Sequence, residues 1–182
     1  MVARQPGRLH VRGQERRRTL DAGASVRALS VRQPWAWAIV NGHKRIENRT
    51  WAPRYRGTLL IHASKSKADL SWMRLVGRYT RTLVRDFEAH LAYGAIVGVV
   101  RLKEILPPEV ETPQPEWSLP GYQHWVFEDA VALREPFPCL GRLQLWRPGE
   151  FAADWCATDL ALWSERGLEP FPDLQPFLGG QA

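Results

Sequence analysis

The segment AIVGVVRLKEI, residues 95–105, decides the fold class, because it is the longest β-rich run in the 182-residue chain. Apolar residues occupy both faces of the strand that this run predicts, and a strand covered on both faces lies inside a sheet. Other β-rich runs must therefore pair with it on either side. We predict these flanking strands at 27–31, 44–51, 57–64, 123–135 and 143–146.

Helices are expected between these strands at irregular intervals. Pro34 opens a short helix in whose first turn a proline is well tolerated, and Gly42 ends it in a left-handed conformation. Apolar residues at helical spacing predict two more helices within 66–92, with a break near Gly77. The proline-rich segment 107–121 predicts a loop. The pattern indicates an α+β fold, a small mixed β-barrel of five to six strands with flanking helices.

The composition predicts one domain, residues 27–147, between two tails. Residues 1–26 are rich in Arg and Gly without a periodic apolar pattern, so we expect them to be disordered. Residues 148–182 are expected to form a helical extension that packs on the domain. No apolar run reaches the roughly 18 residues that span a membrane, and no apolar stretch follows the Arg-rich start as in a secretory signal. We therefore expect a cytoplasmic protein.

The net charge of +6 is distributed unevenly along the sequence. Residues 28–85 hold 12 basic residues against Glu47 and Asp69, whereas residues 86–147 hold 5 basic residues against 9 acids. Such a concentration is typical of a surface that binds a polyanion. A solvated basic helix is the alternative explanation.

Sequence motifs for metals, cofactors and nucleophile elbows are absent from the chain. The two cysteines, Cys139 and Cys156, lie far apart and have no second cysteine or paired histidine at the spacing of zinc ligands. We expect neither a metal site nor a cofactor.

The stretch QPWAWAIVNGHKRIENRTW, residues 33–51, gathers the side chains best suited to bind a ligand. On a regular strand Glu47 and Arg49 share one face, and a glutamate beside cations keeps a low pKa and accepts hydrogen bonds. Lys44, if partly desolvated, could act as a base or a nucleophile. A surface ion pair worth at most about 1 kcal/mol is the alternative.

Aromatic and polar residues elsewhere complete the candidate site. Trp35 and Trp125 are expected to stack on a ligand, because aromatic faces beside cations bind unpaired bases. His62 lies between apolar neighbours and is more readily explained as a core histidine, whereas His124 stands at a loop–strand junction where ligands bind. The pair Ser64-Lys65 would face phosphate or begin a helix. The candidate ligand-binding residues are Gln33, Trp35, Lys44, Glu47, Arg49, His62, Ser64, Lys65, His124 and Trp125.

Five motifs follow one another in order along the chain: Q-P-W-A (33–36), G-x-K-x-x-E-x-R (42–49), R-G-x-L-x-I-H-A (56–63), GAIVGVV (94–100) and P-F-x-C-x-G-x-L-x-L-W (136–146). Together they resemble the ASCH domain of the PUA-like superfamily over about residues 28–147. The resemblance implies a PUA-like β-barrel with a cavity lined by the G-x-K-x-x-E-x-R residues. It also implies an RNA or nucleotide-type ligand.

The resemblance further implies that some relatives are enzymes. One branch hydrolyses the acetyl amide of N4-acetylcytidine and has a threonine where this chain has Glu47. Another relative is a ribonuclease. In a metal-independent ribonuclease Lys44, Glu47 and His124 would be the catalytic residues, and Arg49 would stabilise phosphate charge.

We therefore expect an RNA-binding ASCH domain whose cavity accepts an ordinary or a modified base. The partner would be RNA, another single-stranded nucleic acid, or a nucleotide or nucleoside. The first alternative is an enzyme, with ribonuclease activity ahead of amidohydrolase activity. The second is a protein-interaction adaptor that uses the apolar C-terminal tail. We expect no membrane association, and a monomer or weak dimer.

Overall fold

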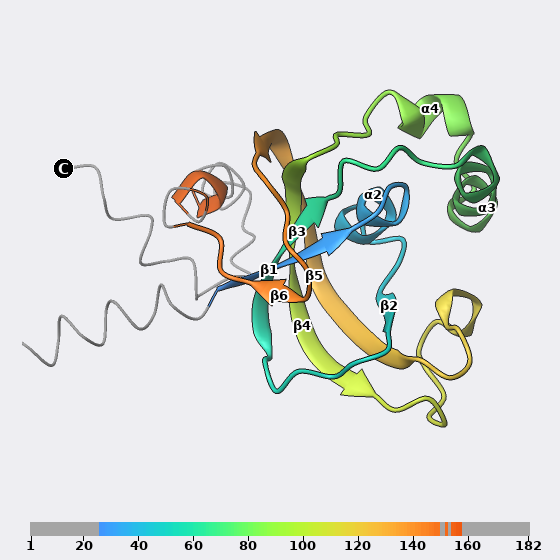
Figure 1. The fold of residues 1–182 in the computed structure, drawn as a ribbon. Coiled ribbons are helices and arrows are strands. Elements are labelled where there is room, and N and C mark those ends of the chain that lie inside the picture. The colour runs from blue at the N-terminus through green and yellow to red at the C-terminus, as the bar shows by residue number, and fades with distance from the viewer. Residues whose placement is uncertain (1–25, 150–151, 153, 158–182) are drawn as a thin grey trace, which may run out of the picture.

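A computed structural model describes residues 26–149, 152 and 154–157, and the fold is built around the predicted central strand (Figure 1). This strand, β4 (Ala95–Leu106), is paired on both sides within a six-stranded mixed sheet of order β2-β5-β4-β3-β1-β6. Among the strands of the described residues, only β1 and β3 pair in parallel. The other strands are β1 (Arg27–Val31), β2 (Ile46–Arg49), β3 (Gly57–Ala63), β5 (Gln123–Pro138) and β6 (Leu145–Trp146).

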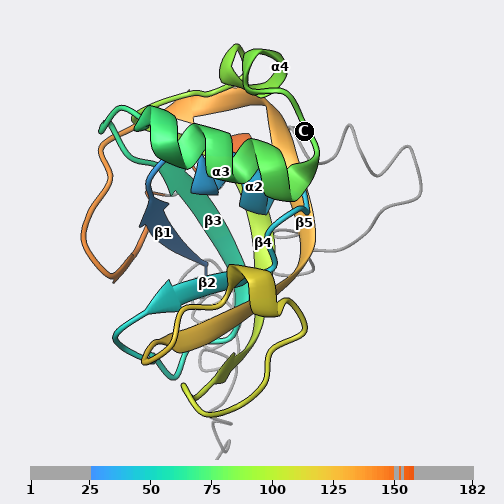
Figure 2. The same cartoon turned by 90° about the vertical axis from the view of Figure 1, so that its right-hand side faces the viewer.

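The sheet curls strongly, as β4 and β5 show in Figures 1 and 2. Strands β2 and β6 form its two edges among the described residues, so the sheet is a half-barrel that does not close through strand pairing. Outermost strand β6 pairs with β1 through Ala28 and Leu29, opposite Trp146 and Leu145. The predicted α+β fold with a mixed, barrel-like sheet is confirmed.

Among the described residues, the α-helices lie where the sequence predicted helices, with one correction, and a 3-10 helix lies in the segment predicted as a loop. The helices are α2 (Trp35–Val40), α3 (Leu70–Thr80), α4 (Val84–Glu88) and the 3-10 helix η1 (Pro115–Trp117). Gly77 does not break the predicted helix: α3 runs through it and ends at Arg81, which is left-handed with φ 54°. A Cβ on Gly77 would lie 2.9 Å from the carbonyl oxygen of Thr82. Glycine is needed there because the chain folds back closely after the helix.

Helix α2 packs tightly against the sheet and carries Trp35 of the candidate site. A Cβ on Gly98 of β4 would lie 2.6 Å from the carbonyl oxygen of Val131 and would also collide with Val40 of α2. The missing side chain therefore lets α2 approach β4 closely. The core that joins α2 to the sheet is apolar and fully buried, and includes Ala36, Ile39, Leu59, Ile61, Val100, Trp125 and Phe127.

The two predicted tails lie mostly outside the described residues. Val26 is buried and belongs to a second core cluster. Ala152, Cys156 and Ala157 are buried in the same cluster, beside Ala28 of β1 and Leu60 of β3. The rest of the expected disordered tail, and most of the expected C-terminal extension, are not described. No helix in the described ranges is long and apolar enough to cross a membrane.

Candidate functional site

Three charged side chains of the G-x-K-x-x-E-x-R stretch form one ion-paired group. Lys44 follows α2 in a turn that folds back on the helix, since the backbone N–H groups of His43 and Lys44 both donate to the carbonyl of Ala38. Its Nζ lies 2.7 Å from Oε2 of Glu47 on β2 and also donates to the carbonyl of Ile46. Oε1 of Glu47 lies 3.1 Å from an Nη of Arg49. The carboxylate therefore bridges two cations.

Burial changes the acid–base properties of this group. Lys44 and Glu47 are 4% and 8% exposed. Burial lowers the pKa of Lys44, although the Glu47 carboxylate opposes the shift. Burial alone would raise the pKa of Glu47, but the attraction and hydrogen bonds of Lys44 and Arg49 are together stronger and lower it. We conclude that Glu47 is an ionised acceptor at neutral pH.

The lowered pKa of Glu47 predicts an acid-dependent contribution to stability. The unfolded state takes up a proton on this side chain near its ordinary pKa of 4.5, while the folded state stays ionised. The unfolded state therefore binds more protons in this range, and stability falls as the pH falls. We expect the free-energy difference between wild type and Glu47→Gln to hold from neutral pH down to about 4.5 and to shrink below it through the folded pKa. Urea unfolding of both proteins across this range measures it, and a difference that stays constant in acid would contradict the prediction.

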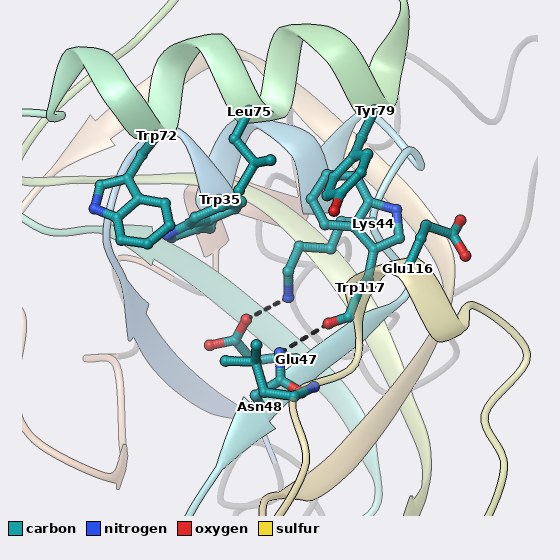
Figure 3. Close-up of a pocket in the computed structure, with 10 residues that line it drawn as sticks. Trp35, Lys44, Glu47, Asn48, Trp72, Leu75, Tyr79, Glu116 and Trp117 are labelled. Atoms are coloured by element: carbon teal, nitrogen blue, oxygen red, sulfur yellow. Dashed lines mark hydrogen bonds and ion pairs between the residues drawn. The ribbon is translucent and has the colours of Figure 1, made fainter.

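Aromatic rings from three segments surround the ion-paired group (Figure 3). Trp35 belongs to α2, Trp72 and Tyr79 project from α3, and Trp117 belongs to η1. They enclose a pocket of about 320 Å³, at the lower end of the range for ligand sites. The other lining residues are Lys44, Glu47, Asn48, Leu75, Glu116 and Leu119. The pocket thus has aromatic walls and a charged, hydrogen-bonding floor.

The η1 wall is fixed by side-chain amides, although the sequence predicted only a loop there. Asn48 on β2 donates to the carbonyl of Trp117 at 2.8 Å and accepts from the N–H of Leu119 at 2.9 Å. Gln114 accepts from the N–H of Arg45 at 2.6 Å and donates to the carbonyl of His43 at 3.1 Å. These four bonds tie the proline-rich segment to the G-x-K-x-x-E-x-R stretch. The wall is therefore preformed, and Asn48 is a positioning residue that the sequence reading missed.

Comparison with known proteins assigns the family. A model of the ASCH domain matches residues 29–137. The chain belongs to the ASCH domain family. This confirms the resemblance found in the sequence.

Two curated relatives match the ASCH domain described here. Activating signal cointegrator 1 of Homo sapiens is 30% identical over 145 residues, which cover 76% of this chain and 24% of the relative. The protein of the same name from Mus musculus is 29% identical over the same length. The chain spans about a quarter of the length of these relatives. Among solved structures, ASCH from Zymomonas mobilis is similar with a TM-score of 0.45 and 13% identity, covering 76% of this chain and 94% of that one.

The ASCH domain brings only some of the predicted site residues to the pocket. Trp35, Lys44 and Glu47 line it, and Arg49 lies behind Glu47, where it also donates to the carbonyl of Ser30 at 2.9 Å. Gln33 instead connects the start of α2 to the segment before β4. Its side chain accepts from the N–H of Trp37 at the start of α2 and donates to the carbonyl of Ala92.

The prediction that Trp125 stacks on a ligand is wrong. Trp125 pairs with Glu47 across β2 and β5, but its ring is fully buried in the core. Trp51 covers it edge-on at 4.7 Å between ring centroids, and the Trp125 indole donates to the Trp51 carbonyl. Trp72, Tyr79 and Trp117 supply the additional aromatic surface of the pocket.

Both candidate histidines are buried outside the pocket lining. Nε2 of His124 lies 3.0 Å from the carbonyl oxygen of Leu119, so this side chain supports the wall from behind. His62 is covered by Gly141 and Trp146, and burial lowers its pKa. Ser64 and Lys65 follow β3 and are also absent from the pocket lining. His124, which the ribonuclease hypothesis pairs with Lys44, thus contacts the pocket wall at Leu119 and does not line the pocket.

The described residues offer no metal-binding cluster of three or more His, Cys, Asp or Glu side chains. The pocket itself presents one lysine donor beside one glutamate acceptor, within aromatic walls. Such a floor can hydrogen-bond the edge of a flat polar ring while the walls contact its faces.

Proposed function

We propose that this ASCH domain binds single-stranded nucleic acid, RNA in the first instance, by admitting one unpaired base into the pocket. The Lys44–Glu47 pair carries the proposal. The two groups bond each other at 2.7 Å, and their remaining N–H and oxygen lone pairs would meet the Watson–Crick edge of a base, where donors and acceptors stand side by side. The aromatic walls supply the stacking surface that every base can use.

The charge of the segment that contains α3 supports a polyanionic ligand. Residues 65–85, from the end of β3 through α3 to the start of α4, carry six basic residues against the single acid Asp69. All six basic side chains are exposed. Phosphates bound by such residues release counterions and make affinity salt-dependent.

The shape and charge of the floor favour a neutral base from an unpaired strand. The pocket lies between α3 and η1, which form two of its walls (Figure 3), and a base must leave a duplex stack to enter such a recess. Two cations, Lys44 and Arg49, flank one carboxylate, so the floor disfavours a positively charged ring.

The binding proposal is tested with a fluorescently labelled single-stranded RNA of mixed sequence in excess EDTA. Leu75→Trp should lower affinity at least about tenfold, because an indole at this position fills the pocket. Wild-type affinity should fall steeply with added salt. The same RNA annealed to its complement should bind more weakly than the single strand.

The matched control is Leu140→Trp, which adds the same ring at a position that is 73% exposed and outside this pocket. It should bind RNA like wild type, and thermal unfolding should show that both variants are folded. Absence of RNA binding at low salt, or equal binding by Leu75→Trp, would overturn the proposal. RNA cleavage in EDTA that is lost in Lys44→Ala would instead support a ribonuclease.

A further inference from the structure

The aromatic walls consist of two inner and two outer rings. The inner rings, Trp35 and Trp117, meet edge-on with centroids 6.1 Å apart, and Trp117 is only 5% exposed. The outer rings lie at opposite ends of this pair. Trp72 contacts Trp35 at 5.6 Å and is 49% exposed, while Tyr79 contacts Trp117 at 5.0 Å and is 41% exposed. The outer rings therefore retain large accessible surfaces that the core does not use.

Helix geometry sets the separation of the two outer rings. Trp72 and Tyr79 are seven residues apart on α3, which is two turns or about 10 Å along the axis. Both rings point from the helix toward the pocket, one at each end of it (Figure 3). Arg74 and Arg78 lie between them in sequence, one turn apart, on another exposed face of the helix.

We propose that Trp72 and Tyr79 are stacking platforms for the two nucleotides that flank the inserted base. This inference rests on the proposed function and specifies its substrate: a strand of at least three nucleotides, not a free nucleoside or nucleotide. Exposed aromatic rings beside cations hold successive bases in sequence-tolerant single-strand binding. The exposed Arg74 and Arg78 add positive charge to the same helix.

A purely structural role explains Trp72 poorly. Its ring is half exposed, whereas α3 packs on the domain through Met73, Val76 and Gly77. An alanine at an exposed helical position also has a favourable helix propensity. The Trp72→Ala variant is therefore expected to fold.

The test combines a protein change with a ligand change. Two five-nucleotide RNAs are compared. The first has all its bases, and the second keeps only its central base between abasic residues. The comparison is repeated with each of the four bases at the central position. Both RNAs carry the same phosphates. Wild type should bind the complete RNA at least about 30-fold more tightly than the single-base RNA, because two flanking stacks contribute about 1–3 kcal/mol each.

In Trp72→Ala this preference should decrease at least about fivefold, while affinity for the single-base RNA changes less. Trp72→Phe should restore most of the preference, and Tyr79→Ala should lower it independently. Tyr93→Ala is the control, since Tyr93 is 39% exposed but does not line the pocket. The inference is overturned if wild type shows no preference, or if Trp72→Ala keeps it in full. If wild type binds neither RNA at low salt, the proposed function itself fails.

Discussion

Glu47→Gln is expected to lower the free energy of unfolding by about 3–5 kcal/mol, because removing one partner leaves a buried cation uncompensated. The Nζ of Lys44 would keep only the neutral amide and the carbonyl of Ile46 as acceptors. Arg49 would lose its ion pair as well, but it is partly exposed and can be hydrated. Urea unfolding at neutral pH, with the midpoint and slope compared with wild type, measures the loss.

Glu128→Gln is the matched control for this prediction. Glu128 also bridges two cations, Arg101 at 3.2 Å and Lys103 at 3.5 Å, but its side chain is 34% exposed. Its loss should therefore cost at most about 1 kcal/mol. The double variant Lys44→Met/Glu47→Gln should be more stable than Glu47→Gln alone, because no buried ammonium is then unpaired. A double variant that shows the sum of both single losses would contradict this account.

Asn48→Ala is expected to weaken RNA binding about tenfold and to lower stability by about 1–3 kcal/mol, because it releases the pocket wall. The carbonyl of Trp117 would lose its donor and the N–H of Leu119 its acceptor. The segment 107–121 should then become more sensitive to limited proteolysis. The loss of affinity follows from displacement of Trp117, since a site is effective when its walls are held in place before the ligand arrives.

Asn41→Ala provides the control for this second prediction. Asn41 also donates its side-chain amide to a tryptophan carbonyl, that of Trp37, at 2.9 Å. It is exposed at the end of α2 and does not line the pocket. Asn41→Ala should leave RNA affinity and the proteolysis of 107–121 unchanged. Equal behaviour of the two variants would show that Asn48 does not hold the wall.

The central part of the fold could be predicted because burial on both faces leaves a continuous apolar pattern, as in β4. The break expected near Gly77 was wrong for a physical reason. A glycine in a helix weakens it, but it also permits close packing, and sequence alone does not distinguish the two effects. The close approach of Thr82 to Gly77 depends on how the chain continues after α3.

The floor of the pocket could be predicted, and most of its walls could not. Lys44 and Glu47 lie three residues apart, so local geometry brings them together. The walls come from α2, α3 and η1, which are distant in sequence. Trp72 and Tyr79 share a helix face, but the orientation of this face toward Lys44 depends on how α3 packs in the fold. Trp125 has the sequence context of a ligand-binding residue and lies opposite Glu47 in the sheet, but the packing of Trp51 against its ring leaves it in the core.

The pairing of β1 with β6 also has a consequence for the order of folding. It joins residues 28–29 to 145–146, so one partner of β1 lies more than 100 residues further along the chain. Contacts of such long sequence separation form slowly, because the intervening chain must be ordered first. On the ribosome, β1 can pair with β6 only after nearly the entire domain has been synthesised. A chain that stops before Leu145 would leave the outer edge of β1 unpaired and open to intermolecular association.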